Sequence, residues 1–269
     1  MSAQSIAMPS VQRAGVTEHI DYIPPSAGIL SYGTPETVCG NDDRNKVTDT
    51  LAIPYQWVVR LEIIFNGARY RGSGFVLNAG QAQDRLVVAT SGHCVFARDT
   101  LAFASSIKVM PQANGSVLPL TPVTVTTANL RASAGWKNSG SPDTDYGVIL
   151  VPWTGTWGVA MWVASDQDLQ NRSVLNSGYP GDKSPYGFNW EDTGNLTGVS
   201  ASMLSYMLDT FGGESGSPVF ALKSGTDWSS GPNVWAVGVH GYGGCPNKAV
   251  RMTQSVMNDY LHWAKEPLA

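Results

Sequence analysis

A serine flanked by glycines is the residue whose surroundings most suggest chemistry. Ser215 lies in the run FGGESGSPV, residues 211–219. Glycine on either side lets the backbone turn tightly and aim two N–H groups at one point. We therefore expect Ser215 to be a nucleophile, with the amides of Gly213 and Ser215 as its oxyanion hole. Glycine and serine are abundant in this chain, so a plain turn is the alternative.

A histidine and an aspartate could activate this serine. His93 follows the run VATSG and is one of four histidines. Its imidazole, with an ordinary pKa of ~6.5, can accept and return a proton near neutral pH. Asp145 precedes the apolar run YGVIL and can orient the imidazole from a buried position, while Asp143 is the competing carboxylate. The pattern predicts a catalytic triad of His93, Asp145 and Ser215.

Short strands must position these residues. Segments rich in Val, Ile and Leu recur between Gly, Asn, Asp and Pro residues, which is typical of an all-β barrel or sandwich. A first set covers residues 56–65, 74–77, 85–90, 106–110, 121–126 and 146–151, and a second covers 173–179, 196–208, 217–222, 234–240 and 249–253. The pattern predicts two β units in one body, separated near residues 152–166.

The two ends of the chain differ from this β pattern. Apolar side chains between residues 253 and 265 recur on one helical face, with Thr253 available as N-cap. Residues 1–36 have no sustained period and are predicted to be a tail or pro-segment. The predicted domains are this tail at 1–36, a first β-barrel at 37–160 with the histidine and aspartate, and a second at 161–269 with the serine, the substrate pocket and the helix.

Composition and charge narrow the possible partners. The 269-residue chain carries 17 Lys and Arg against 21 Asp and Glu, a net charge of −4, and the basic residues are scattered. Nucleic acid is therefore not an expected partner. No run of ~18 apolar residues occurs, so we expect no membrane partner. The three cysteines have no C-x-x-C spacing, so we expect no metal and no cofactor, and at least one thiol stays unpaired within the chain.

The motifs resemble those of a known family. The run TSGHC at residues 90–94 looks like the T-A-G-H-C of chymotrypsin-like serine proteases, and residues 213–218 look like their G-D-S-G-G-P. The order His, Asp, Ser is also theirs and differs from that of subtilisins and α/β-hydrolases. Residues 38–44, 178–183 and 209–213 are similar to the glutamyl endopeptidases of bacilli and the staphylococcal V8 protease. The resemblance covers roughly residues 38–264.

This resemblance implies a fold and an activity. The fold is two six-stranded antiparallel β-barrels with the active site in the cleft between them. The activity is that of a secreted serine endopeptidase, which hydrolyses proteins or peptides through an acyl-enzyme. Members of this family are made as zymogens with a leader and a pro-segment. No leader with an apolar stretch is visible in residues 1–30, so we expect that it has been lost, and we expect a monomer.

The resemblance also implies a preference for Glu, and less for Asp, before the cut bond. Thr210 and His240 stand where this family binds the acidic side chain. Burying a carboxylate requires donors or positive charge. A hydroxyl and an imidazolium supply both, and a buried aspartate nearby could keep His240 protonated. The alternatives are Lys or Arg specificity through Asp209, six places before the serine, and a non-catalytic protease-like binding module.

Three further positions bear on the site. Glu214 replaces the Asp, Asn or Gln usual in the family and could shift the oxyanion loop or pair elsewhere. Cys94 normally has a disulfide partner on an earlier strand, but Gly72 stands about where that cysteine would be. A glutamyl-specific enzyme could cut its own chain after Glu36 and release Thr37 as the N-terminus. A harmless extension, or cleavage elsewhere, is the alternative.

Overall fold

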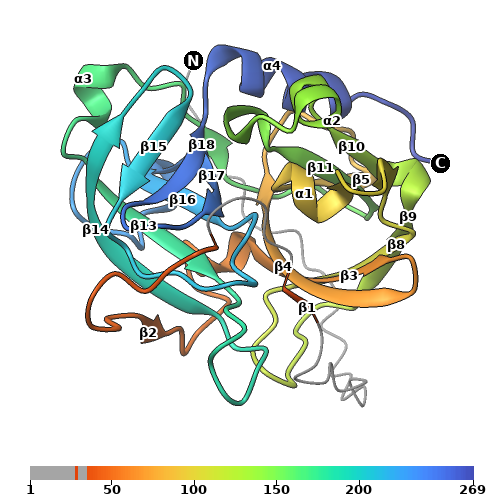
Figure 1. Cartoon of the computed structure of the whole chain (residues 1–269), viewed down its shortest axis with the longest axis horizontal. Helices are drawn as coiled ribbons and strands as arrows, with labels where there is room; N and C mark the ends of the chain where they lie inside the picture. Colours follow the sequence, from red (N-terminus) through yellow and green to blue (C-terminus); the bar gives the residue numbers. More distant parts are fainter. Residues whose placement is uncertain (1–27, 30–34) are drawn as a thin grey trace.

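Two curled β-sheets make up most of the molecule and lie side by side in Figure 1. This computed structural model describes residues 28–29 and 35–269. The first sheet consists of β1 (Gly28–Ile29), β3 (Val58–Phe65), β4 (Ala68–Leu77), β5 (Arg85–Thr90), β8 (Ser106–Pro111), β9 (Val123–Thr126), β10 (Leu130–Ala132) and β11 (Gly147–Pro152). The second consists of β2 (Asn45–Lys46), β12 (Ala160–Met161), β13 (Ser173–Gly178), β14 (Trp190–Val199), β15 (Met203–Tyr206), β16 (Pro218–Leu222), β17 (Val234–Tyr242) and β18 (Asn247–Arg251).

Both sheets curl into barrels. The second has the order β12-β17-β16-β13-β14-β15-β18, and an additional pairing of β17 with β18 closes it as a six-stranded barrel. The first has the order β10-β11-β5-β4-β3-β8-β9 and is nearly closed. Apart from the short parallel pairs β1–β4 and β12–β17, neighbouring strands run antiparallel. The predicted all-β fold with two six-stranded barrels is confirmed.

Alternating side chains of the central strands fill two different cores. In β5, Leu86 and Val88 belong to the interior of the first barrel, whereas Val87 and Ala89 belong to an apolar cluster shared by both barrels. Strand β16 alternates in the same way and places Phe220 in the shared cluster. Because successive side chains in a strand point to opposite faces, these strands are buried on both sides and read as unbroken apolar runs. This shared cluster holds the two barrels together.

Short helices and a hairpin connect the strands, namely α1 (Gly92–Val95), the hairpin β6–β7 (Phe96–Ala97 and Ala102–Phe103), α2 (Ala134–Ser139) and α3 (Asp166–Leu169). The chain ends in α4 (Gln254–Trp263), where the Thr253 hydroxyl accepts from the Val256 amide at 3.3 Å as predicted for an N-cap. The ring of Tyr260 packs on Tyr146 at the start of β11, with ring centroids 5.9 Å apart. Figure 1 shows α4 crossing above both barrels. Within residues 35–269, no helix is long and apolar enough to cross a membrane.

The predicted strand segments agree with the structure except at a few ends. The segment predicted at 196–208 is divided by a turn between β14 and β15, and the segment predicted at 74–77 is the buried end of β4, which begins at Ala68. The first part of β4 is polar and partly exposed, so it lacked the apolar signal used for prediction. Helix α2 was not predicted, because six residues are too few for a helical period.

Candidate active site

The pairing of β5 with β11 brings the predicted histidine and aspartate together. These strands run antiparallel with Thr90 opposite Gly147, so the end of β5 lies beside the start of β11. His93 follows on α1, and Asp145 lies just before β11. The His93 Nδ1 atom is 2.6 Å from Asp145 Oδ2, and the His93 amide donates to Asp145 Oδ1 at 2.8 Å.

The structure separates Asp145 from its competitor Asp143. A second donor to Asp145 is the hydroxyl of Tyr242 on β17, 2.6 Å from Oδ2, so both barrels hold this carboxylate. Asp143 instead accepts from the Ser141 hydroxyl within its own turn. Burial lowers the pKa of His93, but Asp145 and, after it, Cys94 together outweigh burial and raise the pKa well above its ordinary value.

The first barrel also holds the loop that carries Ser215. The Ser73 amide on β4 donates to the Ser215 carbonyl at 2.9 Å, and the Ser73 hydroxyl donates to the Gly213 carbonyl at 2.8 Å. Gly213 has φ of 108°, a conformation that favours glycine. Sequence reasoning missed Ser73. Its signal was the pair of flanking glycines, since a side chain at Gly74 would lie 2.8 Å from the Ala89 carbonyl oxygen.

Cys94 lies on the far side of the nucleophile's backbone. It is a free, buried cysteine whose Sγ is 3.6 Å from the Ser215 carbonyl oxygen. A Cβ placed on Gly72 would lie 3.3 Å from this sulfur. The contact agrees with the expectation that Gly72 occupies the place of a disulfide partner.

Two predicted pocket residues carry unsatisfied polar atoms. His240 lies on β17, where its amide donates to the Ser217 carbonyl at 2.9 Å. Its Nδ1 is 2.6 Å from the Tyr206 hydroxyl. In the part of the chain that the structure describes, neither His240 Nε2 nor the hydroxyl of Thr210 has a hydrogen-bond partner, although both are buried. A buried polar atom without a partner is costly, so each atom needs a partner that the described residues do not provide.

The expectation that His240 is an imidazolium is wrong. Burial, and after it the nearby imidazole of His93, lower the pKa of His240 to about 3. Burial raises the pKa of Tyr206 well above its ordinary value, so the phenol keeps its proton and can donate it to Nδ1 of His240. In that tautomer the only ring proton of His240 is on Nε2, which makes Nε2 a neutral donor.

Asp209 is occupied by the N-terminal segment, which we define as residues 35–47. Its Oδ1 accepts from the Cys39 amide at 2.6 Å, and its Oδ2 accepts from the Asp43 amide at 2.7 Å. A disulfide between Cys39 and Cys245 fixes the same segment to the loop between β17 and β18. Both carboxylate oxygens of Asp209 therefore hold backbone amides.

The N-terminal segment also reaches the nucleophile. The Glu36 carboxylate accepts a hydrogen bond from the Ser215 hydroxyl through Oε1, and the residue is 5% exposed. Burial raises the pKa of Glu36, against the opposing effect of the bond from Ser215. The backbone of Thr37 is held on both sides by Asn247, whose side chain accepts from its amide at 3.2 Å and donates to its carbonyl at 2.7 Å. The predicted cut site thus lies at the nucleophile.

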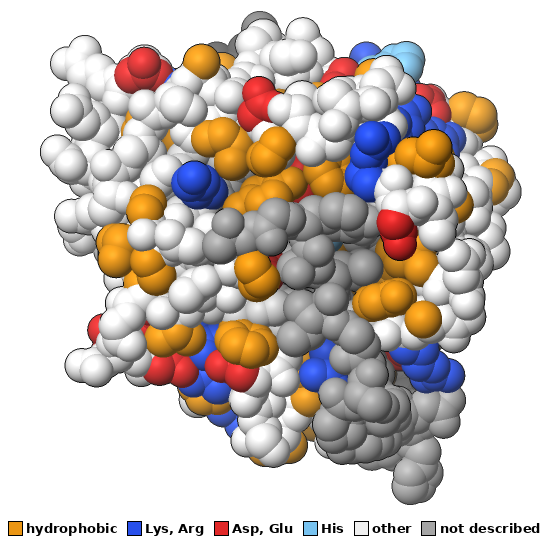
Figure 2. Space-filling model, in the orientation of Figure 1, with side chains coloured by type: hydrophobic (Ala, Val, Ile, Leu, Met, Phe, Trp, Pro, Cys, Tyr) orange, Lys and Arg blue, Asp and Glu red, His pale blue; other side chains and the backbone are white. Residues whose placement is uncertain are grey.

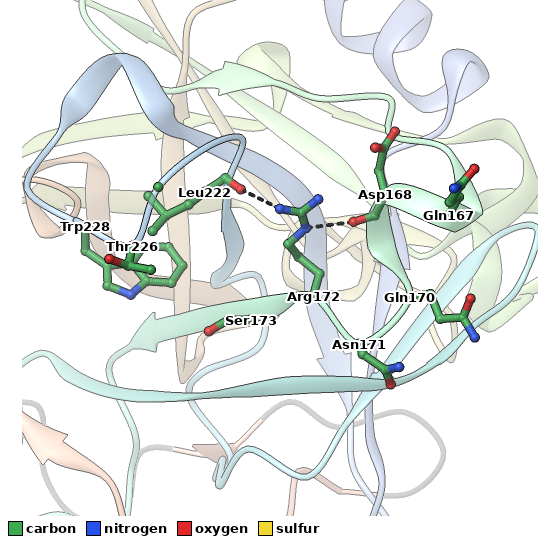
Figure 3. Close-up of a pocket in the computed structure, with 10 residues that line it drawn as sticks. Gln167, Asp168, Gln170, Asn171, Arg172, Ser173, Leu222, Thr226 and Trp228 are labelled. Atoms are coloured by element: carbon green, nitrogen blue, oxygen red, sulfur yellow. Dashed lines mark hydrogen bonds between the residues drawn. The ribbon is translucent and has the colours of Figure 1, made fainter.

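A separate hollow lies on the second barrel, between α3 and the loop after β16. It has a volume of about 310 Å³ and is shown in Figure 3. The guanidinium of Arg172 crosses it and donates to the carbonyls of Asp168 at 2.7 Å and Leu222 at 3.3 Å. None of the predicted site residues lines this hollow, and the guanidinium is engaged by the backbone.

Neither a large charged patch nor a group of metal ligands is found beside these residues in the described part of the chain. On the face seen in Figure 2, basic and acidic side chains occur in small, separate groups. Among residues 28–29 and 35–269, no three His, Cys, Asp or Glu side chains are grouped so that they could hold a metal ion. The predictions about nucleic acid, metal and cofactor stay predictions.

No family model matches the chain. Searches of known proteins and solved structures nevertheless find similar proteases. A glutamyl endopeptidase from Bacillus licheniformis is 34% identical over 232 residues, which cover 85% of this chain and 69% of that protein. A protein named extracellular metalloprotease, from Bacillus subtilis, is 30% identical over 240 residues, covering 86% and 71%. A solved Glu endopeptidase in complex with MPD superposes with a TM-score of 0.70 and 26% identity, covering 85% of this chain and 99% of that structure.

Proposed function

This chain belongs to the glutamyl endopeptidase family and is a serine endopeptidase with the chymotrypsin-like fold, and from that premise we propose that it cuts after Glu, and less well after Asp. The proposed nucleophile is Ser215, with His93 as the general base and Asp145 as its orienting carboxylate. The proposal further includes secretion, action as a monomer, and the division of the chain at residues 36 and 160.

The proposed mechanism proceeds through an acyl-enzyme. His93 takes the proton of the Ser215 hydroxyl as that oxygen attacks the peptide carbonyl, and then gives the proton to the leaving amine. Asp145 keeps the ring in the required tautomer through the 2.6 Å bond to Nδ1 and stabilises the imidazolium. Water then hydrolyses the ester with the same base. The amides of Gly213 and Ser215 would bind the oxyanion in both steps.

One observation carries the proposed substrate preference: two buried polar atoms of the pocket lack partners within the described residues. A Glu side chain in the substrate would give the Thr210 hydroxyl and His240 Nε2 an acceptor. His240 is neutral in the site without substrate, so it would meet the carboxylate as a hydrogen-bond donor through Nε2. A site built to hydrogen-bond a substrate group discriminates strongly against an analogue without it, since its polar atoms are then left unpaired.

Contacts of Asp209 argue against the alternative preference for Lys or Arg. Its two carboxylate oxygens already accept from the amides of Cys39 and Asp43. Binding a basic substrate side chain would require these bonds to break and the N-terminal segment to detach. Cleavage after a basic residue is therefore not expected.

Paired substitutions in the pocket test the proposed preference. His240→Ala and Thr210→Val should each lower kcat/KM for a peptide with Glu before the cut bond, by ~10²-fold or more for the histidine and less for the threonine. Reaction with a small acylating agent, which leaves the pocket empty, should change little because the triad is intact. An equal loss towards both reagents would contradict the assignment of these residues to the pocket.

Residues 1–36 are proposed to be a pro-segment that the enzyme removes by cutting after Glu36. In support, the Glu36 carboxylate accepts a hydrogen bond from the Ser215 hydroxyl, so this residue covers the nucleophile. It is the side-chain carboxylate that meets the hydroxyl, which is a blocked arrangement. Cleavage would require this carboxylate to move towards Thr210 and His240 and the peptide carbonyl to take its place.

A further inference from the structure

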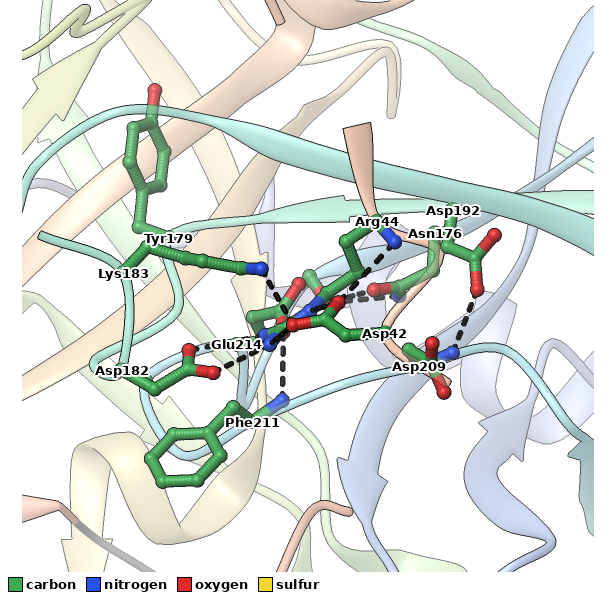
Figure 4. Close-up of polar contacts among 12 residues, drawn as sticks. Asp42, Arg44, Asn176, Tyr179, Asp182, Lys183, Asp192, Asp209, Phe211 and Glu214 are labelled. Carbon is green, nitrogen blue, oxygen red and sulfur yellow. Dashed lines mark hydrogen bonds and ion pairs between the residues drawn. The ribbon is translucent and has the colours of Figure 1, made fainter. Parts of the chain in front are cut away.

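A fully buried arginine contacts three carboxylates next to the nucleophile loop (Figure 4). The guanidinium of Arg44 lies 2.9 Å from Asp42, 2.5 Å from Asp182 and 3.3 Å from Glu214. Asp42 is also paired with Lys183 at 2.6 Å, and the side chains of Asp42 and Asp182 are 33% and 25% exposed. The side chain of Glu214 is only 1% exposed, so of the three carboxylates it is the one that water does not reach. Arg44 is therefore its main source of compensating charge.

The same carboxylate closes the turn in front of Ser215. Glu214 Oε2 accepts from the Phe211 amide at 2.7 Å, and the Glu214 amide donates to the Phe211 carbonyl at 3.0 Å. Glu214 is also the residue between Gly213 and Ser215, whose amides form the proposed oxyanion hole. Holding the Glu214 side chain therefore fixes the directions in which these two amides point.

Loss of Arg44 would take away the buried cation that contacts the Glu214 carboxylate at 3.3 Å. Burial already raises the pKa of Glu214 to about 8, with Arg44 and the Phe211 amide opposing the shift. Without the guanidinium, the Glu214 side chain would lose a hydrogen-bond donor and the positive charge that offsets its burial, and it would be free to turn towards water. Removing one partner of a buried ion pair is costly for this reason. The 211–214 turn would lose its fixed conformation.

Arg44 stays in place whether or not the tail is removed. It lies beyond the proposed cut after Glu36, in a segment anchored by the Asp209 carboxylate and by the Cys39–Cys245 disulfide. The cation that orders the nucleophile loop is therefore part of the segment that remains after trimming.

We propose that Arg44 is a positioning residue that orders the oxyanion loop through Glu214, both before and after removal of residues 1–36. This inference rests on the proposed function, since it takes the Gly213 and Ser215 amides as the oxyanion hole. An oxyanion hole binds the transition state better than the substrate, so its disorder lowers kcat more than it raises KM.

The test compares variants of the trimmed enzyme on the peptide that the parent cuts best. Arg44→Gln should lower kcat by ~10- to 100-fold, somewhat less than the loss of an oxyanion donor itself, with KM changed less than ~2-fold. Affinity for a peptide aldehyde, whose adduct places an oxyanion in the hole, should fall by the same factor as kcat. Arg44→Lys, which keeps the charge, should recover part of both losses.

Two further variants separate positioning from general stability. Arg251 is a comparably buried arginine of the second barrel, paired with Asp166 at 2.6 Å, and it does not contact the nucleophile loop. Arg251→Gln should lower the melting temperature and leave kcat unchanged. Glu214→Ala, which removes the acceptor of both the Arg44 guanidinium and the Phe211 amide, should repeat the kcat loss. The double variant of Arg44 and Glu214 should be no less active than the less active single variant, because both act through one contact.

An unchanged kcat in folded Arg44→Gln overturns the proposal, and so does a double variant whose loss is the product of the single losses. If Arg44→Gln does not fold, Glu214→Ala decides, since it leaves Arg44 with two carboxylates: unchanged kcat and aldehyde affinity then overturn the proposal. Each kcat and each aldehyde affinity is expressed relative to the parent enzyme, measured on the peptide that the parent cuts best. If the parent does not prefer Glu, the proposed preference is wrong, but these ratios still test the role of Arg44.

Discussion

Asp145 and Asp143 have the same side chain two residues apart, and only their surroundings differ. Asp145 accepts from the His93 ring and from the Tyr242 hydroxyl, while Asp143 bonds to Ser141 at the surface of its turn. Asp145→Asn should lower kcat on the order of 10⁴-fold, because an amide stabilises the wrong tautomer of the histidine. Asp143→Asn, the matched control, should change kcat little. Steady-state kinetics of both variants measure these losses. A large loss of kcat in Asp143→Asn and a small one in Asp145→Asn would contradict the triad.

A second prediction at this scale concerns the neutral state of His240. Its pKa is about 3 when folded and near 6.5 when unfolded, so between these values the unfolded chain binds more protons. Its contribution to the free energy of unfolding is therefore lost as the pH falls below ~6.5. In an inactive Ser215→Ala background, His240→Gln should show a smaller loss of stability between pH 7 and pH 4. Denaturant titrations with equal pH dependence would show that folding does not lower the pKa of His240, which would contradict this prediction.

Residue types and order predicted a triad in which the structure brings His93 and Asp145 into contact, because base and carboxylate each have few candidates in this chain. They did not predict that His240 is neutral or that Tyr206 contacts it, since burial and the partners of an imidazole depend on the folded surroundings. They also left Glu214 open, because its partner Arg44 is 170 residues away in the sequence.

Strand β4 joins the two barrels through Ser73. Its hydroxyl donates to Gly213 and accepts from the Tyr179 amide at 2.9 Å. Ser73→Ala should destabilise the fold by about 1–3 kcal/mol, since it leaves the buried Tyr179 amide without a partner. It should also lower kcat, because the Gly213 carbonyl is released. Denaturant unfolding and kinetics measure the two effects, and Ser105→Ala, at an exposed hydroxyl bonded to Ile64, is the control. A Ser73→Ala protein equal to the parent in both would contradict this role.

The predictability of each element followed its burial. Strands buried on both faces, such as β5 and β16, were predicted to within a residue because their apolar runs are continuous. The polar start of β4 and the short strand β2 were not, because neither has an apolar period of its own. The first pairs with β3 and the second with β14. The C-terminal helix was predicted from the period of its buried face.

At the scale of the whole molecule, the proposed removal of residues 1–36 would uncover Ser215. A Ser215→Ala chain should keep residues 1–36 until active enzyme is added, because no nucleophile is present to cut it. N-terminal sequencing after addition should then give Thr37. Glu36→Gln in the same background should resist trimming under identical conditions, since the pocket loses its carboxylate. Full-length protein as active as trimmed protein would show that the contact of Glu36 with Ser215 does not block the site.

The central claim is that this serine endopeptidase recognises Glu through neutral donors in a buried pocket. Digestion of a denatured protein with the trimmed enzyme, followed by sequencing of all fragments, measures this preference without choosing a substrate in advance. We expect cuts after Glu, with fewer after Asp and none after Lys or Arg, and we expect His240→Ala to remove this preference. Frequent cuts after Lys or Arg would contradict the pocket assignment and would mean that Asp209 leaves the N-terminal segment to bind the substrate.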